Sequence, residues 1–386
     1  MKILILSCNT GEGHNSSAYS LKAAMKAQGI DCEVQDTIAL VSPVASKNVS
    51  DAYVYSTKSS LFEHAYKLGE AVSNMDTYFK SPVYAANKIY TKQLYDLIID
   101  GGYDAVVCVH LFPAEALTAL KHKARIAVPT VFVMTDYTCI PFLTETELDK
   151  YVIAHEDLVE EFAERGIPRE KIVPLGIPVD ATKFCSRQDK QYARRMLEEE
   201  FGWKSSDVSA RWFMIMGGSM GFGNMDGLVS CLLELIRPDD KVLCICGRNE
   251  NQLAALAEEY AGYANLHAIG YTDKVSLMMD ASDVLFSKPG GITGTEAVLK
   301  QIPLVHTAPI PGLEDKNARF FHYHNMSYSS LDPAQQAAVA LRLCDDAAYR
   351  LRMTEAQRRN SYPNCCNDII ALLLDIVGKE CKPSAE

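Results

Sequence analysis

The sequence lacks any apolar run long enough to cross a membrane as a helix, which takes about 18–20 uninterrupted apolar residues. We therefore expect no transmembrane helix. The apolar start, MKILILSC, is short and leads straight into a glycine turn. We expect it to form a first strand and not a signal peptide.

The sequence also lacks a positive net charge and a cysteine framework. Its formal charge of −11 argues against a general nucleic-acid binder, which would carry a basic stripe. This charge leaves room for a local basic or aromatic patch that contacts a membrane surface. The twelve cysteines are scattered and include no CxxC pair, so we expect reduced, mostly buried thiols in a cytosolic protein.

What the sequence does contain is a regular alternation of short apolar runs and longer helical patterns. The runs are continuously apolar, as strands covered on both faces of a sheet require. This alternation predicts an α/β protein with two doubly wound, Rossmann-like domains of parallel strands. We expect strands at 2–8, 32–36, 104–110, 130–135, 151–154 and 171–174, and then at 212–216, 241–246, 266–269, 283–286 and 304–307.

The pattern breaks around residues 175–190, where we place the linker between the domains. The predicted domains are residues 1–178 and 179–362. The last segment, 363–386, is expected to form a helix that packs back toward the N-terminal domain. Ligands of such domains bind outside the carboxyl ends of the strands, so the default site is a central cleft between the domains.

Residues 48–100 interrupt the first series with a helical stretch in which aromatic residues alternate with lysines. Aromatic and lysine side chains at helical spacing suit a membrane interface. The alternative is a helical insertion that packs on its own domain, with its lysines in solvent.

The strongest chemical signal is the segment DVLFSKPGGITGTEAVLK in the second half. A strand is expected to end at Phe286, the turn Lys288-Pro289-Gly290-Gly291 follows, and a helix begins near Thr293. The free N–H groups and partial positive charge of a helix start suit a phosphate, and Glu296 is placed to accept hydrogen bonds from a ribose. Ordinary helix capping by a Pro-Gly turn is the alternative.

A second glycine-rich loop, GGSMGFG at 217–223, follows another strand and lacks the Walker lysine. A lone loop of this kind is a weak signal. Together with Gly247, Arg248 and Asn249 at a third strand end, the two loops predict one pocket for a nucleotide diphosphate.

These motifs resemble a known family. GEGH at 11–14, the GGSMGFG loop and KPGGITGTEA look like the monogalactosyldiacylglycerol synthase and processive diacylglycerol glycosyltransferase family, within glycosyltransferase family 28. CVHLFPA at 108–114 and VMTDYTC at 133–139 add to the resemblance, which covers almost the whole chain. It implies a GT-B fold, with an N-terminal acceptor domain, a C-terminal UDP-sugar domain, and an inverting reaction that needs no metal and no further cofactor. It also implies that the 48–100 stretch touches the membrane, with anionic lipid as the expected partner.

Carried onto this chain, the family pattern places the uracil near Gly247, Arg248 and Tyr271. It places the ribose on Glu296, the pyrophosphate against the glycine loops, and the donor sugar near PGLEDKN at 311–317. Family members often have a glutamine near that glutamate, and this departure leaves glucose or galactose open. The residues expected to bind the UDP-sugar are Gly218, Ser219, Met220, Gly247, Arg248, Asn249, Tyr271, Lys288, Pro289, Gly290, Gly291, Thr293, Glu296, Glu314, Asp315 and Asn317.

The acceptor side of the cleft is expected to hold the catalytic base. His14, in an exposed glycine turn with Gly11 and Gly13, has an ordinary pKa near 6.5 that suits a general base. Asp136 is a second candidate base or an orienting partner. His110 and His155 also follow strands, and for both we favour a structural role, although His110 is expected to line the cleft.

We therefore expect a peripheral enzyme at the inner face of the membrane that transfers a hexose from a UDP-sugar to diacylglycerol. A UDP-sugar 2-epimerase and a transferase for another lipid acceptor are the alternatives. An NAD(P)-dependent oxidoreductase would use Asp36 for its ribose, but His14 would crowd the pyrophosphate. A non-catalytic lipid-binding protein would leave His14, Asp136 and the phosphate loops unexplained.

Overall fold

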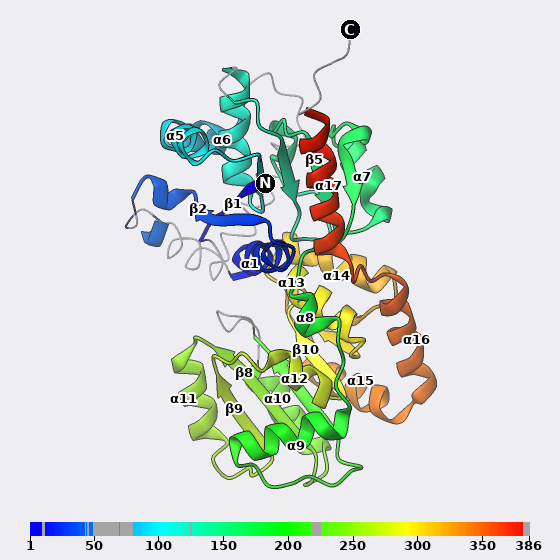
Figure 1. The fold of residues 1–386 in the computed structure, drawn as a ribbon. Coiled ribbons are helices and arrows are strands. Elements are labelled where there is room, and N and C mark those ends of the chain that lie inside the picture. The colour runs from blue at the N-terminus through cyan, green and yellow to red at the C-terminus, as the bar shows by residue number, and fades with distance from the viewer. Residues whose placement is uncertain are drawn as a thin grey trace. The chain divides into compact units, whose positions relative to one another are not determined.

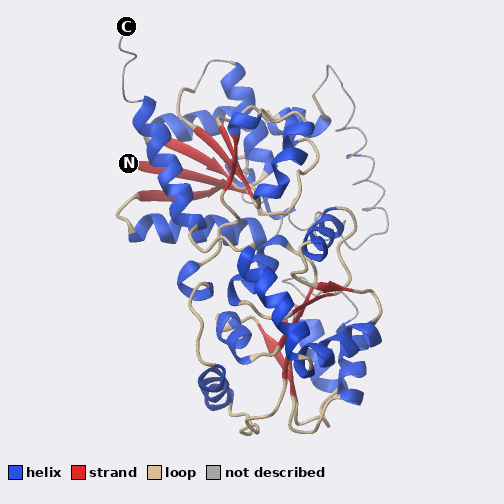
Figure 2. Cartoon of the chain, turned by 90° about the vertical axis from the view of Figure 1, so that its right-hand side faces the viewer, coloured by secondary structure: helices blue, strands red, loops and turns tan. Residues whose placement is uncertain are grey.

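The computed structural model describes residues 1–9, 12–42, 44, 46–48, 69, 80–123, 126–217 and 225–380. Contacts divide the chain into two compact units (Figure 1). Unit 1 is Met1–Ala181 with Tyr362–Glu386, and unit 2 is Thr182–Ser361. Each unit contains a six-stranded sheet with helices on both faces (Figure 2). Among the described residues, none of the helices has the length and apolar character needed to cross a bilayer.

The sheet of unit 1 has the strand order β2-β1-β3-β4-β5-β6, and all neighbouring strands are parallel. Its strands are β1 (Lys2–Ser7), β2 (Asp31–Asp36), β3 (Ala105–Cys108), β4 (Thr130–Val133), β5 (Lys150–Ile153) and β6 (Ile172–Pro174). Its helices are α1 (Glu12–Ala27), α4 (Pro82–Asn87), α5 (Thr91–Gly101), α6 (Leu111–His122), α7 (Val159–Glu164) and α17 (Cys365–Glu380), with the short helices η1 (Ile38–Leu40), η2 (Leu143–Glu145), η3 (Glu156–Leu158) and η4 (Arg169–Lys171).

One face of this sheet is covered by α1 and α17. Ile3 and Ile5 of β1 pack in one buried cluster with Leu21 of α1 and with Ile369 and Leu373 of α17. The C-terminal helix therefore belongs to the core of unit 1, because its apolar side chains would otherwise face water.

The sheet of unit 2 is also fully parallel, in the order β12-β11-β10-β7-β8-β9. Its strands are β7 (Trp212–Met216), β8 (Lys241–Gly247), β9 (Leu266–Gly270), β10 (Val284–Ser287), β11 (Leu304–His306) and β12 (Tyr328–Ser329). After α8 (Ala181–Phe184), which spans the unit boundary, its helices are α9 (Lys190–Phe201), α10 (Met225–Leu235), α11 (Glu250–Glu259), α12 (Val275–Ala281), α13 (Gly291–Lys300), α14 (Leu313–Tyr323), α15 (Pro333–Asp345) and α16 (Ala347–Arg359).

The predicted α/β class with two doubly wound domains is confirmed. Two details differ from expectation. The sequence analysis missed β12, because two residues are too short for a recognisable pattern. The segment around His14 is expected to be a glycine turn, but α1 begins at Glu12, so His14 lies inside this helix.

The early start of α1 has a tertiary cause. Its first turns contain Gly13, Asn15, Ser16 and Ser17, which are poor helix formers. Two of these side chains are held by the rest of unit 1. Asn15 accepts a hydrogen bond from Ser7 Oγ at 2.7 Å, and Ser17 Oγ donates to the Pro178 carbonyl at 2.9 Å.

Every described cysteine is a free thiol, and most of them are buried, as expected from the sequence.

Candidate functional site

The first group of candidate residues lies at the carboxyl edge of the sheet in unit 1. Strands β1, β3 and β4 are adjacent, and Leu6, Cys108 and Phe132 are paired across them. Because the strands are parallel, the segments that follow them meet at one edge. This topology brings together the start of α1, Val109 with His110, and Thr135 with Asp136.

His14 is the centre of this group. Its Nδ1 lies 2.7 Å from the carbonyl oxygen of Val109 and 3.1 Å from Thr135 Oγ1. Its ring meets the ring of His110 edge to face, with centroids 4.6 Å apart. The expectation that His14 is exposed is wrong, since it is half-buried in the first turn of α1, which packs against these two loops.

The surroundings of His14 favour its neutral form. Burial lowers its pKa, while the negative charge of Asp136 and the hydrogen bond to Val109 act in the opposite direction. Burial also holds the pKa of His110 well below its ordinary value, and the nearby His14 contributes to this shift. Both imidazoles are therefore neutral near pH 7, the state in which a histidine can accept a proton.

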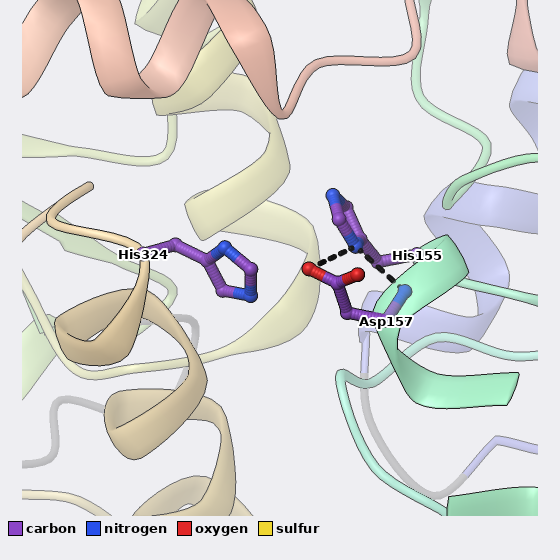
Figure 3. A group of neighbouring side chains, drawn as sticks. All are labelled: His155, Asp157 and His324. Atoms are coloured by element: carbon purple, nitrogen blue, oxygen red, sulfur yellow. Dashed lines mark hydrogen bonds and ion pairs between the residues drawn. The ribbon is translucent and has the colours of Figure 1, made fainter. Parts of the chain in front are cut away.

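His110 and His155 each cap a helix. Nδ1 of His110 accepts a hydrogen bond from Phe112 N at 3.2 Å at the start of α6. Nδ1 of His155 accepts one from Asp157 N at 3.1 Å at the start of η3, with the Asp157 carboxylate 3.7 Å from the same nitrogen (Figure 3). His110 differs from His155 because its ring also contacts His14.

Figure 3 also labels His324, which belongs to unit 2. Within that unit its ring lies 4.3 Å from the ring of Phe320 and 5.3 Å from that of Tyr323, measured between centroids.

The second group of candidate residues lies at the carboxyl edge of the sheet in unit 2. Strands β10, β7, β8 and β9 are consecutive in this sheet, so the segments that follow them share one edge. The described parts of these segments contain the Lys288 turn, Gly217, Gly247 to Asn249, and Tyr271. The predicted residues Gly218, Ser219 and Met220 lie outside the described residues, as does Gly11 of the N-terminal motif.

The Lys288 turn is tied to α14 by two contacts. Lys288 Nζ forms an ion pair with Glu314, and Asn317 Nδ2 donates to the Pro289 carbonyl at 3.0 Å. The second carboxylate oxygen of Glu314 accepts from Ile310 N at 2.7 Å. Because Glu314 and Asn317 are both buried, they fix the shape of the turn.

Asp315 also has a backbone partner. Its carboxylate accepts from Gly312 N at 2.7 Å, and Gly312 has a φ of 100°, which favours glycine. The sequence PGLEDKN therefore builds a specific loop and helix start beside the Lys288 turn.

Helix α13 follows this turn, with Gly290 at its N-cap and Gly291 as its first residue. The ten-residue helix points its free N–H groups and positive dipole end toward the carboxyl edge of the sheet. Thr293 and Glu296 lie half-buried in its first two turns. Gly294 allows close packing on α14, since a Cβ there would lie 2.6 Å from the Phe321 ring.

At the other end of this edge, the Arg248 guanidinium lies 5.2 Å from the centre of the Tyr271 ring. Gly247 has a φ of 58°, and Asn249 caps α11 by accepting from Gln252 N at 3.1 Å. Tyr271 also borders an open pocket of about 500 Å³.

Two sets of residues near these sites were not among the residues expected from the sequence. Phe201 and Trp203 line the pocket beside Tyr271, but Phe201 ends α9, Trp203 follows it, and both are far from Tyr271 in the sequence. Val109 and Thr135 contact His14; both lie within the motifs CVHLFPA and VMTDYTC, but neither carries a charge that would mark it as a partner of His14. Only the adjacency of β1, β3 and β4 could have suggested those contacts.

Two family comparisons cover most of the chain. Residues 14–179 match the monogalactosyldiacylglycerol (MGDG) synthase family, and residues 213–361 match the glycosyltransferase family 28 C-terminal domain. The chain is also similar to processive diacylglycerol beta-glucosyltransferases of Bacillus thuringiensis and Bacillus cereus. Each is 25% identical over 97% of this chain and 93% of the relative.

Solved structures of low sequence identity share the fold. MurG of Acinetobacter baumannii is 14% identical, with a TM-score of 0.59 over 97% of this chain and 99% of that chain. A UDP-GlcNAc 2-epimerase of Neisseria meningitidis is also 14% identical, with a TM-score of 0.64 over 97% of this chain and 100% of that one. These likenesses confirm the predicted GT-B fold.

Proposed function

Since the chain belongs to the monogalactosyldiacylglycerol synthase family of glycosyltransferases, we propose that it transfers a hexose from a UDP-sugar to the hydroxyl of diacylglycerol, with inversion at the anomeric carbon. The chain is a UDP-sugar-dependent hexosyltransferase by this membership. Glucose is the first donor sugar to test, because the curated relatives are named as glucosyltransferases, and galactose is the second.

The observation that carries the proposal is the geometry at His14. A carbonyl oxygen can only accept, so the 2.7 Å contact with Val109 requires the hydrogen of His14 to be on Nδ1. Nε2 is then the basic nitrogen. In the proposed reaction it removes the proton from the acceptor hydroxyl as that oxygen attacks the anomeric carbon.

The residues of unit 2 suit the stabilisation of negative charge on the leaving group. Negative charge develops on the UDP leaving group as the glycosidic bond breaks. The start of α13 and the ammonium of Lys288 supply fixed positive charge that would stabilise it without reorganising. We propose that this replaces a metal ion, so activity should survive removal of divalent cations with EDTA.

We also propose that the enzyme works as a peripheral protein at the inner face of the membrane, with anionic lipid as a partner. Most of the 48–100 stretch lies outside the described residues. In its described part, the ammonium groups of Lys80 and Lys88 lie 5.4 and 4.8 Å from the centre of the Tyr84 ring. The Tyr84 ring is itself buried, so these described residues pack within unit 1, and the support for membrane binding is the diacylglycerol named in the relatives' activity. Sedimentation with anionic vesicles but not with zwitterionic ones is the expected result.

The test of the function is sugar transfer by the purified chain to vesicles that contain diacylglycerol and anionic lipid. UDP-glucose and UDP-galactose are offered separately, with and without EDTA. Glycosylated diacylglycerol from one donor supports the proposal and names the sugar. Release of an epimerised free sugar without acceptor would instead identify a UDP-sugar 2-epimerase, and UDP binding without either product would point to another acceptor.

A further inference from the structure

A chain of polar contacts joins three segments at the carboxyl edge of the sheet in unit 1. It runs from Nδ1 of His14 to Thr135 Oγ1 at 3.1 Å, and from Thr135 Oγ1 to the Asp136 carboxylate at 3.4 Å. The Val109 carbonyl accepts from the same Nδ1 at 2.7 Å. Thr135 is buried, so its hydroxyl depends on these protein partners.

The hydrogens in this chain can be assigned by elimination. If Thr135 donated to Nδ1, that nitrogen would be a bare acceptor, and it would face the Val109 carbonyl oxygen at 2.7 Å with no hydrogen between them. Nδ1 therefore carries the hydrogen and shares it between Val109 and Thr135. The Thr135 oxygen accepts from the imidazole, and its own hydrogen is directed to Asp136.

We propose that Thr135 is a positioning residue. Its hydroxyl orients the His14 ring and transmits the electrostatic effect of the Asp136 carboxylate to that ring through two hydrogen bonds. The inference rests on the proposed function, in which His14 Nε2 accepts the proton of the acceptor hydroxyl. When Nε2 is protonated, the ring becomes a cation. The Thr135 oxygen, polarised by its hydrogen bond to Asp136, then stabilises the positive charge at Nδ1. No proton leaves Thr135 or reaches Asp136 in this scheme.

The scheme gives Asp136 a definite role. Asp136 raises the pKa of His14 against the effect of burial. It would therefore orient the base and not act as the base itself. Among the described residues, His110 from the start of α6 also faces His14, and its own pKa is lowered by burial and by the nearby His14.

The test compares Thr135→Val, Thr135→Ser and Thr138→Val with the wild type. Valine matches threonine in shape and removes the hydroxyl, while serine keeps it. Thr138 is a matched control in the same loop, because its hydroxyl donates to Glu161 at 2.6 Å and not toward His14. Two quantities are measured on each protein, namely kcat with its pH profile on diacylglycerol vesicles, and the pKa and tautomer of His14 by imidazole NMR.

We expect Thr135→Val to lower kcat about tenfold, as loss of one hydrogen bond to a charged group implies, with little change in KM for the UDP-sugar. The pKa of His14 should fall below its wild-type value in this variant. Thr135→Ser should restore both quantities, and Thr138→Val should leave the His14 titration unchanged even if it lowers the melting temperature. In the double variant that combines Thr135→Val with Asp136→Asn, the two losses in kcat should not add, because both substitutions break the same chain of hydrogen bonds.

A Thr135→Val protein with wild-type kcat and an unchanged His14 titration would overturn the inference. So would full activity of Thr135→Val together with inactivity of Asp136→Asn, because Asp136 would then be the base. Failure of the proposed function looks different: the wild type would show no transfer. The NMR titration would still decide whether Thr135 acts on His14.

Discussion

The carboxyl edges of the two sheets have the same topology but carry different kinds of group. In unit 1 the edge gathers groups that can titrate, with His14 and His110 in ring contact and with Thr135 and Asp136 beside them. In unit 2 the edge gathers fixed charge, from the start of α13 and the Lys288–Glu314 pair. The first arrangement suits moving a proton, and the second suits holding charge that appears on a leaving group.

The two edges also differ in the contacts that fix their functional side chains. His14 depends on backbone and hydroxyl partners from two neighbouring loops, so its protonation state responds to small changes there. Lys288 and Pro289 are anchored by buried side chains of α14, Glu314 and Asn317, which lie 26 and 28 residues further along the chain. We infer that substitutions in unit 1 act on kcat and its pH dependence, whereas many substitutions in unit 2 act on UDP affinity as well.

The largest expected effect comes from removing the base. His14→Ala should lower transfer by about 10²–10⁴-fold, the usual range for loss of general base catalysis, and leave UDP affinity unchanged. His122→Ala is the matched control, because His122 is a partly exposed histidine of the same unit that pairs with Glu147 at 2.8 Å. Near-normal turnover of His14→Ala would show that Asp136, and not His14, is the base.

The next prediction distinguishes two roles of Lys288, namely stabilising the leaving diphosphate and anchoring the turn through Glu314. Lys288→Ala should lower kcat by roughly 10–100-fold if its ammonium stabilises the leaving diphosphate. Glu314→Gln, which keeps an acceptor for Ile310 N, should cost less. Equal losses in the two variants would show that Lys288 serves only to anchor the turn through Glu314.

A smaller effect is expected at Glu296. Glu296→Ala should weaken UDP binding about tenfold, measured by isothermal titration calorimetry, because a carboxylate that binds ribose hydroxyls contributes a charged hydrogen bond. Glu258→Ala, on the exposed side of α11, is the control. Unchanged UDP affinity of Glu296→Ala would remove the ribose assignment.

The smallest effect concerns stability and lies in unit 1. Glu115 of α6 is fully buried, and one carboxylate oxygen accepts from Asn87 Nδ2 at 2.6 Å. Its other oxygen has no hydrogen-bond partner among the described residues. Burial is the main reason that its pKa rises from the ordinary 4.5 to about 8, with a further contribution from Glu145.

The folded state therefore holds a proton at Glu115 that the unfolded chain releases above about pH 4.5. The contribution of Glu115 to the stability of the folded state is therefore fully present below about pH 4.5 and is lost as the pH rises toward 8. Relative to the wild type, Glu115→Gln should gain roughly 5 °C in melting temperature between pH 5 and pH 8. Glu147→Gln, which alters an exposed carboxylate, should show no such trend. Parallel pH curves for Glu115→Gln and the wild type would contradict the account.

The fold could be predicted from the sequence because its signals are local. Apolar runs such as 212–216 and 241–246 are strands in the structure, and each is followed by glycine or polar residues that end it. The loops at the carboxyl edge of unit 2 are recognisable for the same reason, since the glycines and the helix start are neighbours in the chain.

The contacts within the sites could not be predicted in the same way. The sequence around Gly13 looks like a turn, and the hydrogen bonds of Asn15 with Ser7 at the end of β1 and of Ser17 with Pro178 explain why α1 begins at Glu12. The partners of His14 follow two other strands, β3 and β4. Glu314, which pairs with Lys288, lies on a separate helix, α14. These contacts depend on packing between segments, which residue patterns do not encode.

The most direct test of the division between proton transfer and charge stabilisation is the anomeric configuration of the product. NMR of the glycolipid formed from an α-linked UDP-hexose and diacylglycerol gives this configuration. A single displacement assisted by His14 predicts a β-linked sugar, with the product lost in His14→Ala and retained in His122→Ala. An α-linked product would contradict the account, because retention needs a different arrangement of groups from one base facing one leaving group.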